Sequence, residues 1–147
     1  MELNKLSRIV CIDYGRKKLG IAMSDPLGIT AQPFDTWHNL SRKQILDKIK
    51  DLIDDYGVDR IVVGLPLTLK GEKGKIADFA IEFVSFLRDN LHIKVVMWDE
   101  RMSSKIAVRT LQALGKKPSK NRNKIDKIAA SVILQDYMTF IGNSAGN

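Results

Sequence analysis

Apolar residues occur along the chain in short, continuous runs that are typical of strands buried on both faces. The first run, SRIVCIDY at 7–14, is rich in β-branched residues, and RIVVGLPL from Arg60 and KVVMWDE from Lys94 have the same character. The short basic link after the first run leads to LGIAMS, which predicts an antiparallel hairpin. The turn signal Asp25-Pro26 then precedes a third expected strand at Ile29 to Phe34.

Other segments repeat apolar residues at helical spacing. Ser41 and Gln44 form a capping box at the start of one such segment, which Gly57 ends. Further helices are predicted at 76–87, from Ser103 or Ser104 to a stop at Gly115, and at 125–141. The expected order is therefore β-β-β-α-β-α-β-α-α.

This order predicts a single α/β domain with a mixed sheet of three antiparallel strands followed by α/β units. The length of 147 residues agrees with one domain, expected at 1–141, followed by a frayed tail at 142–147. The apolar runs are short, as in the four residues Ile9 to Ile12, whereas a membrane span needs roughly 20. With no signal-peptide pattern at the N-terminus, we expect a cytoplasmic protein that does not enter a membrane.

The composition restricts the chemistry. One cysteine and two isolated histidines cannot build a zinc site of nitrogen and sulfur ligands. The net charge of +7 suggests an anionic partner such as nucleic acid. The sequence leaves the oligomeric state open.

Acidic residues lie where strands end, and ligands of open α/β sheets bind beyond the carboxyl ends of the strands. Asp13 ends the first strand, Asp99 and Glu100 end the strand KVVMW, and Asp126 opens the last helix. Carboxylates gathered at one edge need a cation between them, and Mg²⁺ prefers oxygen ligands and keeps waters for substrate phosphates. Two such ions can hold the attacking water and the leaving oxygen of a phosphodiester. The pattern favours a nuclease.

Each carboxylate also has a structural interpretation. Asp13 suits an ordinary strand exit, and Asp126 suits the positive end of a helix dipole. Because side chains alternate across a strand, only one of Asp99 and Glu100 can face the site of Asp13, and position does not decide which. Asp25, before a proline in a turn, is interpreted as structural.

The segment from Gly115 to Lys124 is predicted to be a polar, basic loop that is mobile until substrate arrives. Solvated loops are often lysine-rich, but the position of this one beside Asp126 favours contacts with phosphate groups. The candidate nucleic-acid-binding residues are Lys116, Lys117, Lys120, Arg122 and Lys124. Trp37 and Trp98 could stack on bases, although packing in the core is the preferred interpretation.

Four motifs in register identify a resemblance to a known family. The segments DYGRKKLGIAMSDPLGITAQP, VVGLPLTLKGEKG, WDERMSS and KIDKIAASVILQDY resemble the YqgF or RuvX family, described as Holliday junction resolvases and as pre-16S rRNA nucleases. The match runs from about Arg8 to Tyr137. The family is similar in fold to ribonuclease H, with helices on both faces of the sheet.

The resemblance implies a two-metal nuclease that uses Mg²⁺, with Mn²⁺ as a substitute. The carboxylates of its D-x-G, DER and D-x-x-A-A motifs correspond to Asp13, Glu100 and Asp126 as catalytic, metal-binding residues. Glu100 is preferred to Asp99 because related resolvases use a glutamate at the end of this strand. Arg16 stands where many members have a smaller polar residue, which leaves the finer contacts beside Asp13 open.

The most favoured function is processing of pre-16S ribosomal RNA, with resolution of branched DNA as the alternative. A non-catalytic RNA-binding module would use the basic charge equally well but would not need three converging carboxylates. The D-x-G hairpin also resembles the phosphate loop of actin-like ATPases. Those enzymes bind nucleotide between two such domains, and this chain supplies one.

Overall fold

The computed structural model describes residues 7–15, 17–65, 75–99 and 103–145 of the chain. Its strands are β1 (Arg8–Tyr14), β2 (Lys18–Ser24), β3 (Ala31–His38), β4 (Val58–Leu65) and β5 (Lys94–Asp99). Its helices are α1 (Arg42–Tyr56), α2 (Lys75–Asn90), α3 (Ser103–Ala113) and α4 (Arg122–Ala145), with a 3₁₀ turn, η1 (Pro118–Lys120), before α4. This is the element order that the sequence predicts.

The five strands form one mixed sheet in the order β3-β2-β1-β4-β5. The first three strands pair antiparallel, whereas β4 pairs parallel with β1 and β5 pairs parallel with β4. The parallel strands are joined by the helical crossovers α1 and α2, as parallel pairing requires. The expected mixed α/β architecture is confirmed.

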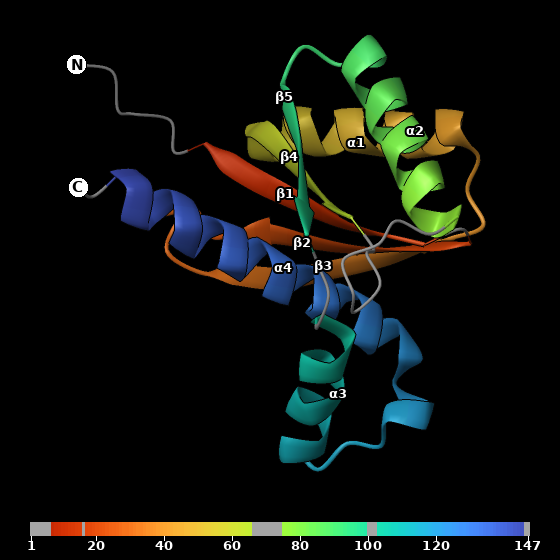
Figure 1. Ribbon diagram of the computed structural model, residues 1–147, viewed down its shortest axis with the longest axis vertical. Helices are drawn as coiled ribbons and strands as arrows, with labels where there is room; N and C mark the ends of the chain where they lie inside the picture. The colour runs from red at the N-terminus through yellow and green to blue at the C-terminus, as the bar shows by residue number, and fades with distance from the viewer. Residues whose placement is uncertain (1–6, 16, 66–74, 100–102, 146–147) are drawn as a thin grey trace.

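Helices cover both faces of the sheet (Figure 1). On one face, Val10 and Ile12 of β1 share a buried cluster with residues of α1 and α2, including Ile49 and Phe83. On the other face, the intervening Cys11 packs in a second cluster with residues of α4. Alternate side chains of β1 therefore pack into two different cores, one on each face of the sheet. This explains why the sequence of β1 is continuously apolar. Helix α3 projects from this body and packs against α4 (Figure 1).

The predicted capping residues lie at both ends of α1. The Ser41 hydroxyl accepts a hydrogen bond from the Gln44 backbone amide at 3.1 Å, and the Gln44 side chain accepts one from the Ser41 backbone amide at 2.8 Å. Gly57 ends the helix with φ 70°, in the left-handed region that favours glycine. The capping box and the C-terminal glycine are confirmed.

Some boundaries differ from the prediction. Strand β3 spans Ala31–His38 rather than the expected Ile29 to Phe34, because Ile29 and Thr30 are held in the turn by Asp25. Strand β5 was expected to be buried on both faces but is an edge strand, with Met97 39% exposed. No helix in the described ranges is long and apolar enough to cross a membrane.

The expected basic loop is also shorter than predicted. Helix α4 begins at Arg122, so Arg122 and Lys124 belong to its first turn and not to a loop. The backbone carbonyl of Asn121 accepts hydrogen bonds from the amides of Lys124 and Ile125, which starts the helix there. At its other end α4 continues to Ala145, into the segment that the sequence assigns to a tail.

Candidate functional site

A row of five paired residues crosses the sheet at the carboxyl end of β1. In order across the strands they are Thr36, Gly20, Asp13, Gly64 and Trp98. Paired residues on neighbouring strands face the same side of a sheet. The Thr36 hydroxyl donates to the backbone carbonyl of Asn123 at 2.6 Å, and the Trp98 indole donates to Asp136 at 2.9 Å. Both acceptors lie in α4, so Asp13 is a carboxylate on the α4 face between two residues without side chains.

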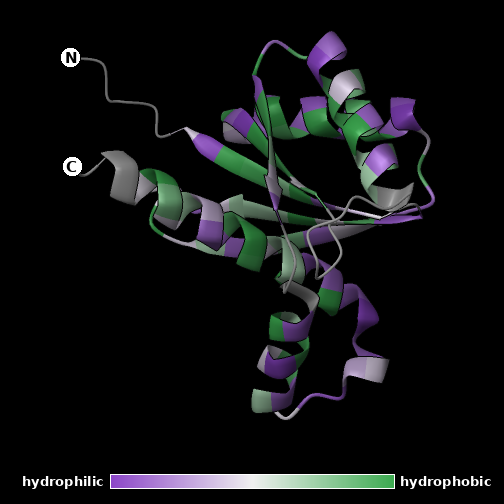
Figure 2. Ribbon diagram, in the orientation of Figure 1, coloured by the Kyte–Doolittle hydropathy of each residue, from purple (hydrophilic) through white to green (hydrophobic). Residues whose placement is uncertain are grey.

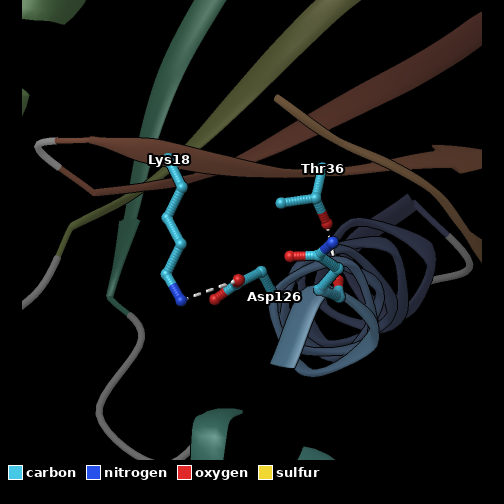
Figure 3. A network of polar contacts seen from close by, with 4 residues as sticks. Lys18, Thr36 and Asp126 are labelled. Atoms are coloured by element: carbon cyan, nitrogen blue, oxygen red, sulfur yellow. Dashed lines mark hydrogen bonds and ion pairs between the residues drawn. The ribbon is translucent and has the colours of Figure 1, made fainter. Parts of the chain in front are cut away.

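Gly20 allows α4 to approach the sheet beside Asp13. A Cβ atom at Gly20 would collide with the backbone carbonyl of Asp126. The hydrogen bond from Thr36 to Asn123 ties the same turn of α4 to β3 (Figure 3). Because Gly20 pairs directly with Asp13, the start of α4 brings Asp126 to the strand next to Asp13. A glycine inside a strand indicates such a close backbone approach.

The Asp126 carboxylate is shielded and paired with one lysine. Its side chain is 18% exposed, and its Oδ2 atom lies 3.1 Å from Nζ of Lys18 on β2 (Figure 3). The same Oδ2 atom is buried and accepts no hydrogen bond of good geometry in the described part of the chain. The contact is therefore an ion pair by distance without a directed hydrogen bond. A buried carboxylate oxygen of this kind has capacity for a further cationic partner.

Asp99 is the last residue of β5. Trp98 faces α4, so Asp99 belongs to the opposite face, together with Val95 of the α1 and α2 core. Glu100 lies outside the described residues. Among the residues that are described, no group of three histidine, cysteine, aspartate or glutamate side chains lies close enough to hold a metal ion.

The five candidate basic residues gather between the end of α3 and the start of α4, in a largely hydrophilic segment (Figure 2). Helix α3 ends where Gly115 adopts φ 74°. The Lys116 side chain contacts Lys124, and this contact between two ammonium groups lowers the pKa of Lys124 below its ordinary value. The ion pairs within the described ranges join Lys18 to Asp126 and Arg42 to Glu82, and so do not neutralise the basic segment. Its positive charge stays available to an anion.

Asp25 has the structural role that the sequence predicts. Its carboxylate accepts hydrogen bonds from the Ile29 amide at 2.9 Å and from the hydroxyl and amide of Thr30 at 2.8 and 3.2 Å. The hydrogen bond from the Ile29 amide, followed by that from the Thr30 hydroxyl, lowers the pKa of Asp25 below 3.8. These bonds close the turn between β2 and β3.

Sequence reasoning missed three residues that shape the site. Lys18 reads as part of a short basic link, although it pairs with Asp126 108 residues later in the chain. Gly20 and Gly64 occupy the interiors of apolar runs, where an isolated glycine is the available signal for close backbone approach. The pairing register that places both beside Asp13 depends on the folded sheet.

Most of the chain matches one protein family. The profile of the RuvX family, described as "Holliday junction resolvase", matches residues 7–139. Two similar relatives carry the name "Putative pre-16S rRNA nuclease". One, from Sulfurihydrogenibium sp., is 43% identical over 135 residues and covers 90% of each chain. The other, from Clostridium botulinum, is 40% identical over 131 residues, covering 89% of this chain and 96% of the relative.

Solved structures share the fold at low sequence identity. RuvC of T. thermophilus in complex with a Holliday junction substrate matches with a TM-score of 0.54 and 15% identity, covering 92% of this chain and 96% of that one. Fowlpox virus resolvase in complex with Holliday junction DNA matches with a TM-score of 0.55 and 15% identity, covering 91% and 98%. These likenesses confirm the expected ribonuclease H-like fold class.

Proposed function

This chain belongs to the RuvX family, and we propose that it is a nuclease that hydrolyses phosphodiester bonds with the help of divalent metal ions. The observation that carries the proposal is the contact of the Asp126 backbone with Gly20, the residue that pairs with Asp13. Asp126, from a distant part of the chain, thereby lies beside β2 at the level where β2 pairs with Asp13 near the carboxyl end of β1. A binding module gains nothing from carboxylates placed beside one another, whereas a metal site uses such carboxylates as ligands.

We propose Asp13, Glu100 and Asp126 as the metal ligands and catalytic residues. The buried Oδ2 atom of Asp126 has capacity for a cation, and the glycines that pair with Asp13 on both sides carry no side chain that would cover it. Asp99 belongs to the other face, which supports Glu100 as the third ligand. Such a set of oxygen donors fits Mg²⁺, with Mn²⁺ as a substitute. When bound, the metal supplies an activated water and stabilises charge on the leaving oxygen.

The other residues of the site orient the Asp126 carboxylate or bind the substrate. The ammonium of Lys18 holds the Asp126 carboxylate toward β2 at 3.1 Å. We propose that Lys116, Lys117, Lys120, Arg122 and Lys124 bind the phosphate groups of the substrate strand. Phosphate contacts position a nucleic acid without reading its sequence, so this segment supplies affinity and not base specificity.

For the substrate, we propose a ribosomal RNA precursor, because the similar relatives carry the name of pre-16S rRNA nucleases. Such a substrate agrees with the cytoplasmic location expected from the sequence. Branched DNA is the second candidate, favoured by the description of the family as Holliday junction resolvase. Both substrates present the same phosphodiester chemistry to the carboxylates.

A cleavage assay with Mg²⁺ on a ribosomal RNA precursor and on a four-way DNA junction tests the proposal. We expect the RNA precursor to be cut and cleavage to disappear when EDTA removes the metal. Cleavage of the junction alone would show that the substrate is branched DNA. Binding of either nucleic acid with no cleavage under these conditions would support the non-catalytic alternative.

A further inference from the structure

A small cavity lies behind the candidate site, on the α1 and α2 face of the sheet. Its volume is about 190 Å³, and it lies between the start of the β1–β2 hairpin connection and the first turn of α1. Its walls include Tyr14, Trp37 and Phe83, and Lys17, Lys18 and Arg42 also line it. A cavity of roughly 150 Å³ can enclose one benzene ring, so this cavity has room for a single flat aromatic ring.

Aromatic residues packed in the core form part of the walls of the cavity. Trp37 is 5% exposed and Phe83 1% exposed, so both are fixed by packing. The rings of Tyr14 and Phe83 lie 5.0 Å apart with an interplanar angle of 34°. Every nucleobase has a flat face, and stacking on aromatic side chains is the usual way in which proteins hold single-stranded nucleic acid.

Three basic residues line the same cavity. Lys17 and Arg42 are exposed basic residues, and the first turn of α1 carries no acidic residue, so the positive end of the helix dipole is not offset there. Glu82 is the acidic partner of Arg42, at 3.7 Å, and its side chain is 66% exposed. An exposed pair at this distance is weak and leaves Arg42 able to bind a phosphate. An aromatic wall beside basic groups fits a base together with its phosphate.

Neighbouring residues connect the cavity with the carboxylates. Asp13 faces α4 and the next residue, Tyr14, lines the cavity on the opposite face. Lys18 lines the cavity and also pairs with Asp126. A single strand passing over the end of this hairpin can therefore present one phosphate to the carboxylates and an adjacent base to the cavity.

We propose that this cavity binds one unpaired base of the substrate strand, next to the bond that is cut, with its phosphate held by Lys17 and Arg42. This inference rests on the proposed nuclease function for its choice of strand. A free nucleotide offers the same chemistry, so the test includes both sources. The site would hold the strand through stacking and phosphate contacts, which every nucleotide sequence can make.

Trp37 reports directly on occupancy of the cavity. The chain contains two tryptophans, so Trp98→Phe leaves Trp37 as the remaining fluorophore. In this variant, with EDTA present to prevent cleavage, we expect a single-stranded RNA oligonucleotide to quench the fluorescence saturably. Arg42→Ala in the same background should weaken this affinity about tenfold, since one charge-assisted hydrogen bond to phosphate is removed. Arg42→Lys should restore part of it.

Lys43→Ala is the matched control, because Lys43 is exposed in the same turn of α1 and is not among the residues lining the cavity. A loss of affinity with Lys43→Ala equal to that with Arg42→Ala would overturn the proposal. Unchanged Trp37 fluorescence while anisotropy shows the oligonucleotide bound would also overturn it. Quenching by uridine monophosphate with none by the oligonucleotide would exclude a strand as the occupant.

The unsubstituted protein provides a second readout if Trp98→Phe does not fold. An RNA oligonucleotide carrying 2-aminopurine should change its emission on binding, and Arg42→Ala should weaken this response while Lys43→Ala leaves it unchanged. Either readout is independent of cleavage. A protein that cuts neither substrate but whose Trp37 is still quenched would contradict the nuclease proposal and support the base site.

Discussion

The backbone carbonyl of Asp126 lies against Gly20, where the Cβ atom of any other residue would be. This contact joins the start of α4 to the middle strand of the antiparallel part of the sheet. The same contact places Asp126 beside the strand that pairs with Asp13, since Asp13 is the partner of Gly20 on β1. The candidate site therefore requires a glycine at position 20 as well as the acidic side chains.

Gly20→Ala should displace α4 and lower the free energy of unfolding by about 1–3 kcal/mol or more, as overpacking does. The added methyl group meets backbone, which cannot rotate away as a side chain can. Urea unfolding measures the loss, and nuclease activity should fall in the fraction that still folds. Gly142→Ala is the control, because nothing lies within 4 Å of the added atom in α4. Equal stabilities for Gly20→Ala and the unsubstituted protein would show that α4 does not rest on this strand.

Lys18→Met should strengthen binding of Mg²⁺ or Mn²⁺, because the Lys18 ammonium pairs with the same Asp126 Oδ2 atom that we propose binds the metal. Isothermal titration calorimetry with the metal alone measures the effect without reference to cleavage. Lys17→Met, which removes a charge from an adjacent exposed position, is the matched control. Weaker metal binding by Lys18→Met than by Lys17→Met would mean that Lys18 supports the metal site and does not compete for it.

Asp25→Asn should destabilise the protein most at neutral pH. The hydrogen bonds from Ile29 and Thr30 favour the charged carboxylate and lower its pKa, so its stabilising contribution is present above pH 3.8 and is lost as the pH falls through the lowered pKa. Urea unfolding at neutral pH and at about pH 3 should show the difference between the two proteins shrinking in acid. Asp51→Asn, which removes a carboxylate from an exposed position of α1, is the control.

Replacing Lys116, Lys117, Lys120 and Arg122 together by alanine should weaken binding of all nucleic-acid sequences alike. Each bound phosphate releases counterions, so the slope of log affinity against log salt should flatten by about 0.7 to 0.9 for each phosphate group that the variant no longer binds. Fluorescence anisotropy across a salt series provides both quantities. If affinity and salt slope both stay unchanged, the segment between α3 and α4 is a solvated connection and the substrate binds elsewhere.

Much of this architecture could be predicted from the sequence because its signals are local. The capping box at Ser41 and the left-handed glycines at 57 and 115 fix helix ends without help from distant residues. The continuous apolar run of β1 indicates burial on both faces, and both cores are present. Such patterns depend on residues within a few positions of one another.

Features that depend on pairing across the sheet could not be predicted in the same way. KVVMW reads as a buried strand, but β5 is at the edge, since no strand pairs with its outer side in the described sheet. The register that aligns Gly20, Asp13 and Gly64 is set by the assembled strands and not by any one of them. The ion pair between Lys18 and Asp126 likewise needs α4 in place on β2.

The most direct test of the proposed nuclease is the cleavage rate of Asp13→Asn with Mg²⁺, on the ribosomal RNA precursor and the DNA junction. The substitution keeps the shape of the side chain and removes the charge that we propose holds the metal. Asp51→Asn, at an exposed position of α1, controls for the loss of one carboxylate elsewhere. We predict that Asp13→Asn folds and binds nucleic acid but loses nearly all cleavage, while Asp51→Asn cuts normally. An Asp13→Asn protein that cuts as fast as the unsubstituted chain would contradict the account.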